Sequence, residues 1–409
     1  MTDLILTINA GSSSIKFCIY AISGGSLVKL LQGSFSGIGA VPQVEVKGMG
    51  DAASTLEQQL ADLRQCHFFD HSSALSALSS WFSLSLEGYC VRVVSHRVVH
   101  GGNKFSGPVI VNSDVLRDME VLVNLAPLHQ PICIQAIKAM VGCFPTAQQL
   151  ACFDTAFHRT MPQVAQTFAL PPRFAEAGVK PYGFHGLSYE FIAANLPPKL
   201  GDIKDNKVVI AHLGQGASMC AMVNCQSVAT TMGFTPLDGL PMATRSGTID
   251  AGVVFYLNQQ MGMSVKEISA LLNEESGLLG LSGLSSDIRQ LVESHAPRAA
   301  FAMQYFVYRI CRELGSLVAA MGGLDGLIFT GGVGDGSAFV RGAVCEQSHW
   351  LGIKLDNRAN DRHAEEISRP DSPVSVWAMA TDEEQRLAYH GLTQWQSTSR
   401  EQPNHWRLM

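Results

Sequence analysis

The sequence has few charged residues, and lysine and arginine do not cluster anywhere along it. Only 16% of the 409 residues are charged, and the formal net charge is −6. Because nucleic-acid binding depends on grouped cationic side chains, this composition argues against a nucleic-acid partner. The chain also lacks a basic leader with an apolar core, and an apolar run of about 20 residues that a membrane helix needs. We therefore expect a cytoplasmic protein that works without a membrane.

The ten cysteines are scattered, and no two of them form a Cys-x-x-Cys pair. In a long chain without a secretion signal, this distribution predicts reduced and mostly buried thiols. Cys220 and Cys225 are poorly spaced for a metal site, and no histidine pair follows them. We expect no metal there.

The length and the apolar content predict two domains. A chain of 409 residues exceeds what one core usually supports, and the 46% of hydrophobic residues is enough for two cores.

Residues 4–20, LILTINAGSSSIKFCIY, are the most informative stretch. Alternating apolar residues on both sides of Gly11 predict a strand, a tight turn and a second strand. The turn is rich in backbone and hydroxyl donors and is followed by Lys16, which suits a phosphate group. It is not a Walker loop, because the GK[ST] ending is missing and a strand follows. An ordinary hairpin turn is the alternative for this stretch taken alone.

A second stretch repeats this layout. Residues 208–223, VVIAHLGQGASMCAMV, align with the opening stretch so that Asn9 falls on His212 and Gly11 on Gly214. A long-period repeat of this kind suggests two similar domains that face each other. A third glycine-rich turn, residues 326–336, follows a predicted strand and precedes a predicted helix at 338–350. Three such turns favour a nucleotide cleft between two domains.

Elsewhere the sequence predicts secondary structure in less detail. We expect a β-meander over residues 20–50, helices at 70–84, capped by Asp70, and at 130–141, strands at 90–102 and 151–158, and a loop at 171–187.

Ten motifs together resemble one known family. In chain order they are INAGSSSIK, HRVVHGG, LAPLH, FDTAFH, YGFHGLS, HLGQGAS, MGFTPLDGLPMATRSG, SSDIR, FTGGVG and TDEE. They resemble the acetate/propionate kinase family of the sugar-kinase, Hsp70 and actin superfamily, from about residue 4 to about 390. The resemblance implies an α/β fold of two similar actin-like ATPase domains of the ribonuclease H-like type, with an active-site cleft between them. The N-terminal domain would comprise 1–150 and about 386–409. Residues 151–385 would form a nucleotide-binding and dimerisation domain, and the protein would be a homodimer.

The implied activity is that of an acetate kinase, a phosphotransferase with a carboxyl group as acceptor. It transfers the γ-phosphoryl group of ATP reversibly to acetate, giving acetyl phosphate and ADP, with Mg²⁺, or alternatively Mn²⁺, as the metal. A kinase for propionate or another short-chain acid is the first alternative. A weakly active nucleotide-binding regulator on the same fold is an alternative of another class, and a sugar kinase is disfavoured by the apolar acceptor pocket.

The resemblance also assigns roles to single residues on the acceptor side. Asp154, His185 and Arg245 would be catalytic. An arginine fork matches a carboxylate, so Arg97 would anchor the substrate. Because a carboxylic acid is already ionised at neutral pH, we expect Asp154 to orient groups rather than to remove a proton. The other acceptor residues would be Val99, Leu128, His129, Phe184 and Pro236, and the bulk of Val99 favours acetate.

The resemblance also assigns residues to the metal and to the nucleotide that donates the phosphoryl group. Asn9 and Glu383 would serve the metal, with contact through water a natural mode for Mg²⁺, and Glu384 is a neighbour that sequence alone does not separate from Glu383. The residues that would hold ATP or ADP are Ser12, Ser14, Lys16, His212, Leu213, Gly214, Gln215, Gly216, Asp287, Ile288, Arg289, Gly331, Gly332, Val333, Gly334 and Asp335.

Several neighbours of these residues depart from the family pattern. Gln215 and Gln130 stand where asparagine is usual, Thr248 where aspartate is usual, and Tyr189 where histidine is usual. The charged anchors are retained, so the departures bear on nucleotide choice and rate more than on the class of reaction.

Overall fold

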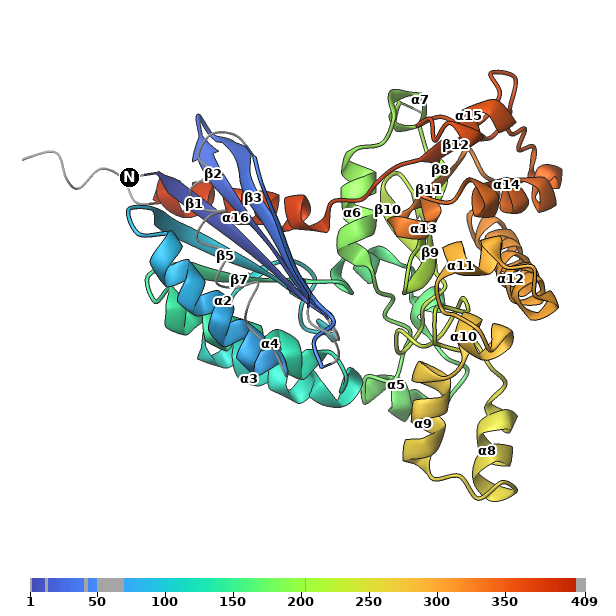
Figure 1. Ribbon diagram of the computed structural model, residues 1–409, viewed down its shortest axis with the longest axis horizontal. Coiled ribbons are helices and arrows are strands. Elements are labelled where there is room, and N and C mark those ends of the chain that lie inside the picture. Colours follow the sequence, from blue (N-terminus) through green and yellow to red (C-terminus); the bar gives the residue numbers. More distant parts are fainter. Residues whose placement is uncertain (1, 12–13, 40–42, 50–69, 203, 402–409) are drawn as a thin grey trace, which may run out of the picture. The chain divides into compact units, whose positions relative to one another are not determined.

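The computed structural model describes residues 2–11, 14–39, 43–49, 70–202 and 204–401. It divides into two compact units (Figure 1). Unit 1 comprises Met1–Ala156 and Asp382–Met409, and unit 2 comprises Phe157–Thr381. Within the described ranges, no helix combines the length and the apolar character needed to cross a membrane.

Unit 1 is built on a seven-stranded mixed sheet in the order β4-β3-β2-β1-β5-β7-β6. Strands β1 to β4 form an antiparallel meander, and β1, β5 and β7 run parallel to one another. The elements are β1 (Asp3–Ala10), β2 (Ser14–Ser23), β3 (Ser26–Ser36), β4 (Gln43–Gly48), α2 (His71–Ser85), β5 (Cys90–Val98), β6 (Val109–Ile110), α3 (Ser113–Val121), α4 (Gln130–Cys143), β7 (Gln148–Phe153) and α16 (Glu383–Glu401).

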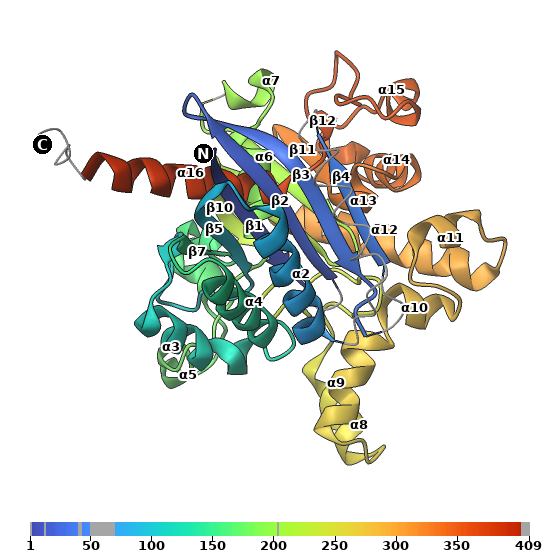
Figure 2. The same ribbon diagram turned by 60° about the vertical axis from the view of Figure 1, so that its left-hand side comes forward.

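Helices cover both faces of this sheet. Helices α2 and α4 lie on one face of the sheet (Figure 2). Their side chains pack with alternate residues of β1 and β2 into the main core of the unit. The other face is covered by α16, which contacts β1 and β5 most closely. A Cβ on Gly391 of α16 would lie 2.7 Å from Ser95 Oγ and 3.0 Å from Ile5 Cγ2, so the glycine permits this close approach. The last helix of the chain thus completes the first domain.

Unit 2 is built on a five-stranded mixed sheet in the order β10-β9-β8-β11-β12. The long helix α12 packs against β9 and β10, and α6 contributes Tyr189 and Ile192 to a second core cluster with β8, β9 and β11. The elements are α5 (Pro172–Glu176), α6 (Gly186–Ala194), α7 (Pro198–Gly201), β8 (Lys207–Leu213), β9 (Ala217–Val223), β10 (Gln226–Thr230), α8 (Ala251–Gln259), α9 (Val265–Glu274), α10 (Gly277–Ser282), α11 (Ile288–Glu293), α12 (Pro297–Met321), β11 (Gly326–Thr330), α13 (Gly331–Gly334), α14 (Ala338–Gln347), α15 (Asn357–Asp361) and β12 (Ser375–Ala378).

The two sheets share one topology, as the sequence repeat suggested. The order β3-β2-β1-β5-β7 corresponds to β10-β9-β8-β11-β12, with the same antiparallel meander followed by parallel strands. The two turns differ in length, because Gly11 N–H donates to Ser14 O, three residues on, at 2.8 Å, whereas Gly214 N–H donates to Gly216 O, two residues on, at 3.0 Å. The predicted α/β class with two similar halves is confirmed. The predicted cleft between them stays a prediction.

Most of the expected elements are present with shifted ends. The helices expected at 70–84 and 130–141 are α2 and α4, and the Asp70 side chain caps α2 by accepting from Ser73 N–H. The strand expected at 151–158 is β7, which begins at Gln148 and ends at Phe153. The loop expected at 171–187 is wrong in part. It contains the short helix α5, because a proline at the first helical position has the backbone angle that a helix start needs.

Gly33 of β3 provides a test of the unit 1 core. It pairs directly with Phe17, whose ring lies over it, and a Cβ there would be 2.6 Å from Phe17 Cε1. Gly33→Ala should displace this ring from its contacts with Phe35, Trp81 and Phe82, at a cost of about 1–3 kcal/mol. The measurement is the thermal midpoint of unfolding. Gly107→Ala is the control, because a Cβ there meets nothing within 4 Å; equal midpoints for the two variants would contradict this packing.

Candidate active site

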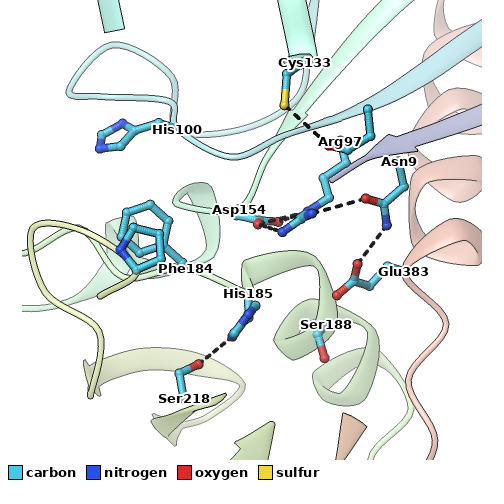
Figure 3. A network of polar contacts seen from close by, with 12 residues as sticks. Asn9, Arg97, His100, Cys133, Asp154, Phe184, His185, Ser188, Ser218 and Glu383 are labelled. Atoms are coloured by element: carbon cyan, nitrogen blue, oxygen red, sulfur yellow. Dashed lines mark hydrogen bonds and ion pairs between the residues drawn. The ribbon is translucent and has the colours of Figure 1, made fainter. Parts of the chain in front are cut away.

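Four predicted residues of unit 1 meet at one edge of its sheet. Asn9 and Arg97 lie near the carboxyl ends of the neighbouring parallel strands β1 and β5, and Asp154 directly follows β7. Glu383 begins α16. Because carboxyl ends of adjacent parallel strands share an edge, residues far apart in the sequence are placed side by side. Figure 3 shows Asn9, Arg97, Asp154 and Glu383 linked in this way.

These residues form one continuous hydrogen-bond network. Arg97 donates from Nη2 and Nε to Asp154 Oδ2, at 2.6 and 3.0 Å, and from Nη1 to Asn9 Oδ1 at 3.2 Å. Asn9 Nδ2 donates in turn to Glu383 Oε2 at 3.1 Å and to Glu384 Oε1 at 3.2 Å. The amide of Asn9 therefore joins the arginine–aspartate pair to two carboxylates at the start of a helix, a position that favours negative charge.

Burial makes the Arg97–Asp154 pair mutually dependent. Asp154 is 1% exposed. Burial alone would lower the pKa of Arg97, but the carboxylates of Asp154 and Glu383 outweigh it and raise that pKa. Burial raises the pKa of Asp154, and the Arg97 guanidinium opposes this. Removing one partner of such a pair leaves an uncompensated buried charge, which typically costs about 3–5 kcal/mol.

The acidic end of the network has hard oxygen donors that suit Mg²⁺. Burial raises the pKa of Glu384, the neighbouring Glu383 adds to the effect, and Lys16 opposes it. Two adjacent carboxylates fit a metal that takes few protein ligands and keeps its waters, while Asn9 turns its N–H groups to them and its Oδ1 to Arg97. Among the described residues there is no cluster of three or more histidine, cysteine, aspartate and glutamate side chains that could hold a metal ion.

In unit 2, two stacked histidines lie beside the glycine turn between β8 and β9. The rings of His185 and His212 are 4.3 Å apart and tilted by 25°. His185 Nδ1 is 2.8 Å from Ser218 Oγ, and His212 Nδ1 is 2.8 Å from Ser188 Oγ. His185 has a left-handed backbone, with φ of 59°, where it caps the start of α6. Such a conformation is uncommon in a residue with a side chain and occurs at functional sites as well as in turns.

The predicted nucleotide segments of unit 2 converge on one cavity. It has a volume of about 440 Å³. Three segments that sequence reasoning singled out separately contribute to its wall: the β8–β9 turn, the start of α11, and the turn after β11. The lining residues are Gly214, Gln215, Ala243, Leu278, Ser286, Asp287, Ile288, Arg289, Gly332, Val333, Gly336 and Ser337.

A completely buried arginine supports the third of these segments. Arg341 of α14 is 0% exposed, and it donates to the carbonyl oxygens of Gly334 and Asp335 and to Asn360 Oδ1. Burial lowers the pKa of Arg341, and Asp335 opposes this. Because it donates both to the carbonyls of Gly334 and Asp335 and to Asn360, the guanidinium ties the end of the glycine turn to α15. Nothing in the sequence pattern pointed to this residue.

The other predicted residues lie as follows. In unit 1, Ser14 and Lys16 lie at the start of β2, Val99 is buried after β5, and Leu128 and His129 precede α4. In unit 2, Phe184 is buried beside His185, and Arg245 donates to Pro236 O at 3.4 Å. The Leu213 side chain is buried, and the backbone of Leu213 lies against Gly331. His212, Gly216, Gly331, Gly334 and Asp335 flank the lining segments. Ser12 lies outside the described residues.

The comparisons with known proteins cover nearly the whole chain. A family model described as the Acetokinase family matches residues 4–389. The chain belongs to the acetokinase family. An acetate kinase of Rhodopseudomonas palustris (strain TIE-1) is 48% identical over 395 residues, which is 95% of this chain and 98% of the relative.

Solved acetokinase-family structures agree with this fold. The acetate kinase of Porphyromonas gingivalis has a TM-score of 0.81 at 34% identity, covering 96% of this chain and 99% of that one. A propionate kinase from Francisella tularensis subsp. tularensis SCHU S4 has a TM-score of 0.82 at 32% identity, covering 94% and 98%. The family resemblance expected from the ten motifs is confirmed.

Sequence reasoning missed the side chains that hold the predicted site residues in place. Ser188 and Ser218 contact the two histidines, and Arg341 holds the glycine turn. Ser218 lies inside the motif HLGQGAS, so its place just after the turn was visible in the sequence, but its partner was not. Glu384, left open beside Glu383, contacts Asn9 as directly as Glu383 does.

His158 is buried next to the loop that carries His185, and it leads to a prediction about pH. Its Nε2 donates to Phe184 O and its Nδ1 contacts Ser227 Oγ, both at 2.9 Å. Burial lowers the pKa of His158 from 6.5 to about 4. The unfolded chain therefore takes up a proton between these values that the folded chain does not, so stability falls as the pH falls from 6.5 to about 4. The loss from this residue should be about 3 kcal/mol.

The measurement is the free energy of unfolding in denaturant at pH 7 and at pH 4. His158→Gln should lose less stability between these two pH values than the wild type does. The same exchange at exposed His349 controls for the substitution itself. An identical loss in the His158→Gln variant and the wild type would contradict a neutral buried histidine.

Proposed function

We propose that this protein transfers the γ-phosphoryl group of ATP to acetate, giving acetyl phosphate and ADP, and that it catalyses the reverse reaction as well. The observation that carries the proposal is the match to an acetate kinase over 95% of this chain. The predicted charged anchors Arg97, Asp154, Arg245 and Glu383 are all present, with His185. Phosphoryl transfer needs mainly in-line positioning and charge stabilisation, which is what such residues provide.

Arg97 would bind the carboxylate of the acceptor. Its contacts to Asp154 and Asn9 use Nε, one N–H of Nη2 and one of Nη1. Because a guanidinium has five N–H donors, it retains capacity for a bidentate contact to a carboxylate. Asp154 would hold the guanidinium in a fixed orientation, and the pair would present a preformed anchor whose charge is already balanced before the substrate arrives.

The donor side would use the cavity of unit 2. The glycine turns at Gly214 and Gly332 would lie along the phosphates, and the Asp287–Arg289 segment would lie near the adenosine. His185 and Arg245 would stabilise the charge on the phosphoryl group during transfer. Ser14 and Lys16 would line the phosphate path from unit 1. Asn9, Glu383 and Glu384 would hold Mg²⁺, which supplies charge neutralisation on the phosphate oxygens when it is bound.

Propionate is the second candidate acceptor, because a propionate kinase is among the structural relatives. The residues that would line the acyl pocket, Val99, Leu128, Phe184 and Pro236, are all apolar. One methylene changes binding in such a pocket by only about 1–3 kcal/mol, so the preference is one of degree. The bulk of Val99 and the acetate kinase names of the more identical relatives favour acetate.

A hydroxamate assay tests the proposed activity. The protein is incubated with ATP, Mg²⁺ and acetate, propionate or butyrate, and acyl phosphate is trapped with hydroxylamine. We expect acyl hydroxamate in the order acetate, propionate, butyrate. A protein that binds ATP but forms no acyl phosphate with any acid would be a regulator rather than a kinase.

Arg97→Ala should raise the KM for acetate and lower kcat, because the carboxylate loses its anchor and Asp154 is left unpaired. Arg92→Ala is the matched control. Arg92 lies on the same strand and is ion-paired to Asp3 at 2.8 Å, but it belongs to no part of the proposed site. Equal kinetics for the two variants would refute the role of Arg97.

We infer that the protein is a homodimer formed through unit 2. Large apolar side chains are exposed on two helices of that unit: Val253, Phe255 and Tyr256 on α8, and Phe301 and Tyr308 on α12. Burying them against a second copy would remove exposed apolar area from water. Light scattering coupled to size exclusion should give twice the chain mass, and Phe301→Glu should shift it towards one chain mass. A monomeric wild type would contradict the inference.

A further inference from the structure

The predicted catalytic histidine is the end of a short buried relay. His185 Nδ1 contacts Ser218 Oγ at 2.8 Å, and Ser218 Oγ also contacts the hydroxyl group of Tyr189. Ser218 and Tyr189 are both 0% exposed. Within the described part of the chain, the Tyr189 hydroxyl has Ser218 as its one hydrogen-bonding partner. The relay therefore begins at Tyr189 in the core and runs through Ser218 to His185.

The number of protons in this relay determines which group donates each of its hydrogen bonds. If Tyr189 donates to Ser218 and Ser218 donates to His185 Nδ1, each hydroxyl proton has an acceptor. If instead His185 donated from Nδ1 to Ser218, either the Tyr189 proton or the Ser218 proton would have no acceptor. A buried donor without a partner costs about 1–3 kcal/mol. Burial raises the pKa of Tyr189 well above its usual range, so the phenol stays protonated and can act as the donor.

This direction places the single imidazole proton of His185 on Nε2. The Nε2 edge lies against the β8–β9 turn, since a Cβ on Gly216 would be 3.1 Å from Nε2. That turn is part of the segment proposed to hold the phosphates. A neutral imidazole with a proton on Nε2 is a donor for a phosphate oxygen, and its other nitrogen is fixed by an accepted hydrogen bond.

We propose that Ser218 is a positioning residue that holds His185 as the neutral Nε2–H tautomer, with this N–H directed at the glycine turn, and that Tyr189 supports it by donating to Ser218. The proposal rests on the role given to His185 in the proposed function. It gives a physical role to a residue at which this chain departs from the family pattern, since Tyr189 stands where histidine is usual. A tyrosine hydroxyl donates its one proton to Ser218, which leaves Ser218 to donate to His185. An imidazole at this position can instead accept the Ser218 proton.

The test reads the tautomer directly, in the unliganded full-length protein. Two-bond ¹H–¹⁵N correlation spectra of ring-labelled histidines distinguish Nε2–H, Nδ1–H and imidazolium forms, and the His185 signals are those lost in His185→Gln. At neutral pH we expect the pure Nε2–H form in the wild type. Ser218→Ala should give a mixture, because Nδ1 loses its partner. Tyr189→Phe should keep Nε2–H, since Ser218 still donates, whereas Tyr189→His should give a mixture.

Steady-state kinetics provide a second, independent measurement. Ser218→Ala should lower kcat by about tenfold or more with a smaller change in the KM for ATP, as expected for a group that orients a catalytic histidine. Tyr182→Phe is the matched control: it removes another buried tyrosine hydroxyl of unit 2, which donates to Gly178 O at 2.8 Å, and should leave the His185 tautomer unchanged.

A wild-type His185 found as Nδ1–H or imidazolium would overturn the proposal, and so would a pure Nε2–H form in Ser218→Ala. The tautomer is measured without substrate. A negative hydroxamate assay would therefore contradict the proposed function, but the relay could still be tested. A tautomer other than Nε2–H in a fully active protein would contradict only the relay.

Discussion

Parallel strand pairing is the constraint on which the site in each unit depends. Strands β1, β5 and β7 end together, and Asn9, Arg97 and Asp154 at those ends are polar or charged and largely buried. Such groups are tolerated only when each finds a partner, and here Asn9, Arg97 and Asp154 satisfy one another. In unit 2 the same pairing of β8 with β11 sets His212 level with Thr330, where the third glycine turn begins. The chemistry proposed for both units is thus located at one kind of place, the carboxyl edge of a sheet.

The fold was accessible from the sequence because its signals are local or repeated. Alternation identified β1 and β2, the Asp70 cap identified α2, and the repeat of the opening turn at His212 predicted two halves of one topology. The three nucleotide segments were also accessible, since each follows a recognisable pattern.

What the sequence did not indicate are pairings between distant positions. Tyr189 and Ser218 lie on different elements, and Arg341 reaches the glycine turn only because α14 packs beside it. A buried polar side chain shows its type in the sequence but not its partner. Helix α5 was missed for another reason, because prolines that suggest a loop can equally begin a helix.

The departures from the family pattern fall into two physical kinds. Gln215 is exposed and lines the cavity of unit 2, so its extra methylene changes the shape of a surface that a ligand would meet. Thr248 instead makes an internal bond, donating to Asp238 Oδ1 at 2.6 Å and accepting from Gly239 N–H at 3.0 Å. There the substituted side chain is accommodated by hydrogen bonds within the loop that carries Arg245. A departure from a motif can therefore alter recognition at one position and only the support of a loop at another.

The place of α16 has a consequence for how this protein is made. Unit 1 needs segments from both sides of unit 2 in the chain, since α16 covers the face of its sheet that contains Ile5 and Ser95 and brings Glu383 to Asn9. During synthesis on the ribosome, the residues of unit 2 emerge before α16 does. Strands β1, β5 and β7 must therefore wait with one face uncovered until α16 has emerged. The hydrogen-bond network around Asn9 therefore lacks its acidic end until Glu383 and Glu384 have been made.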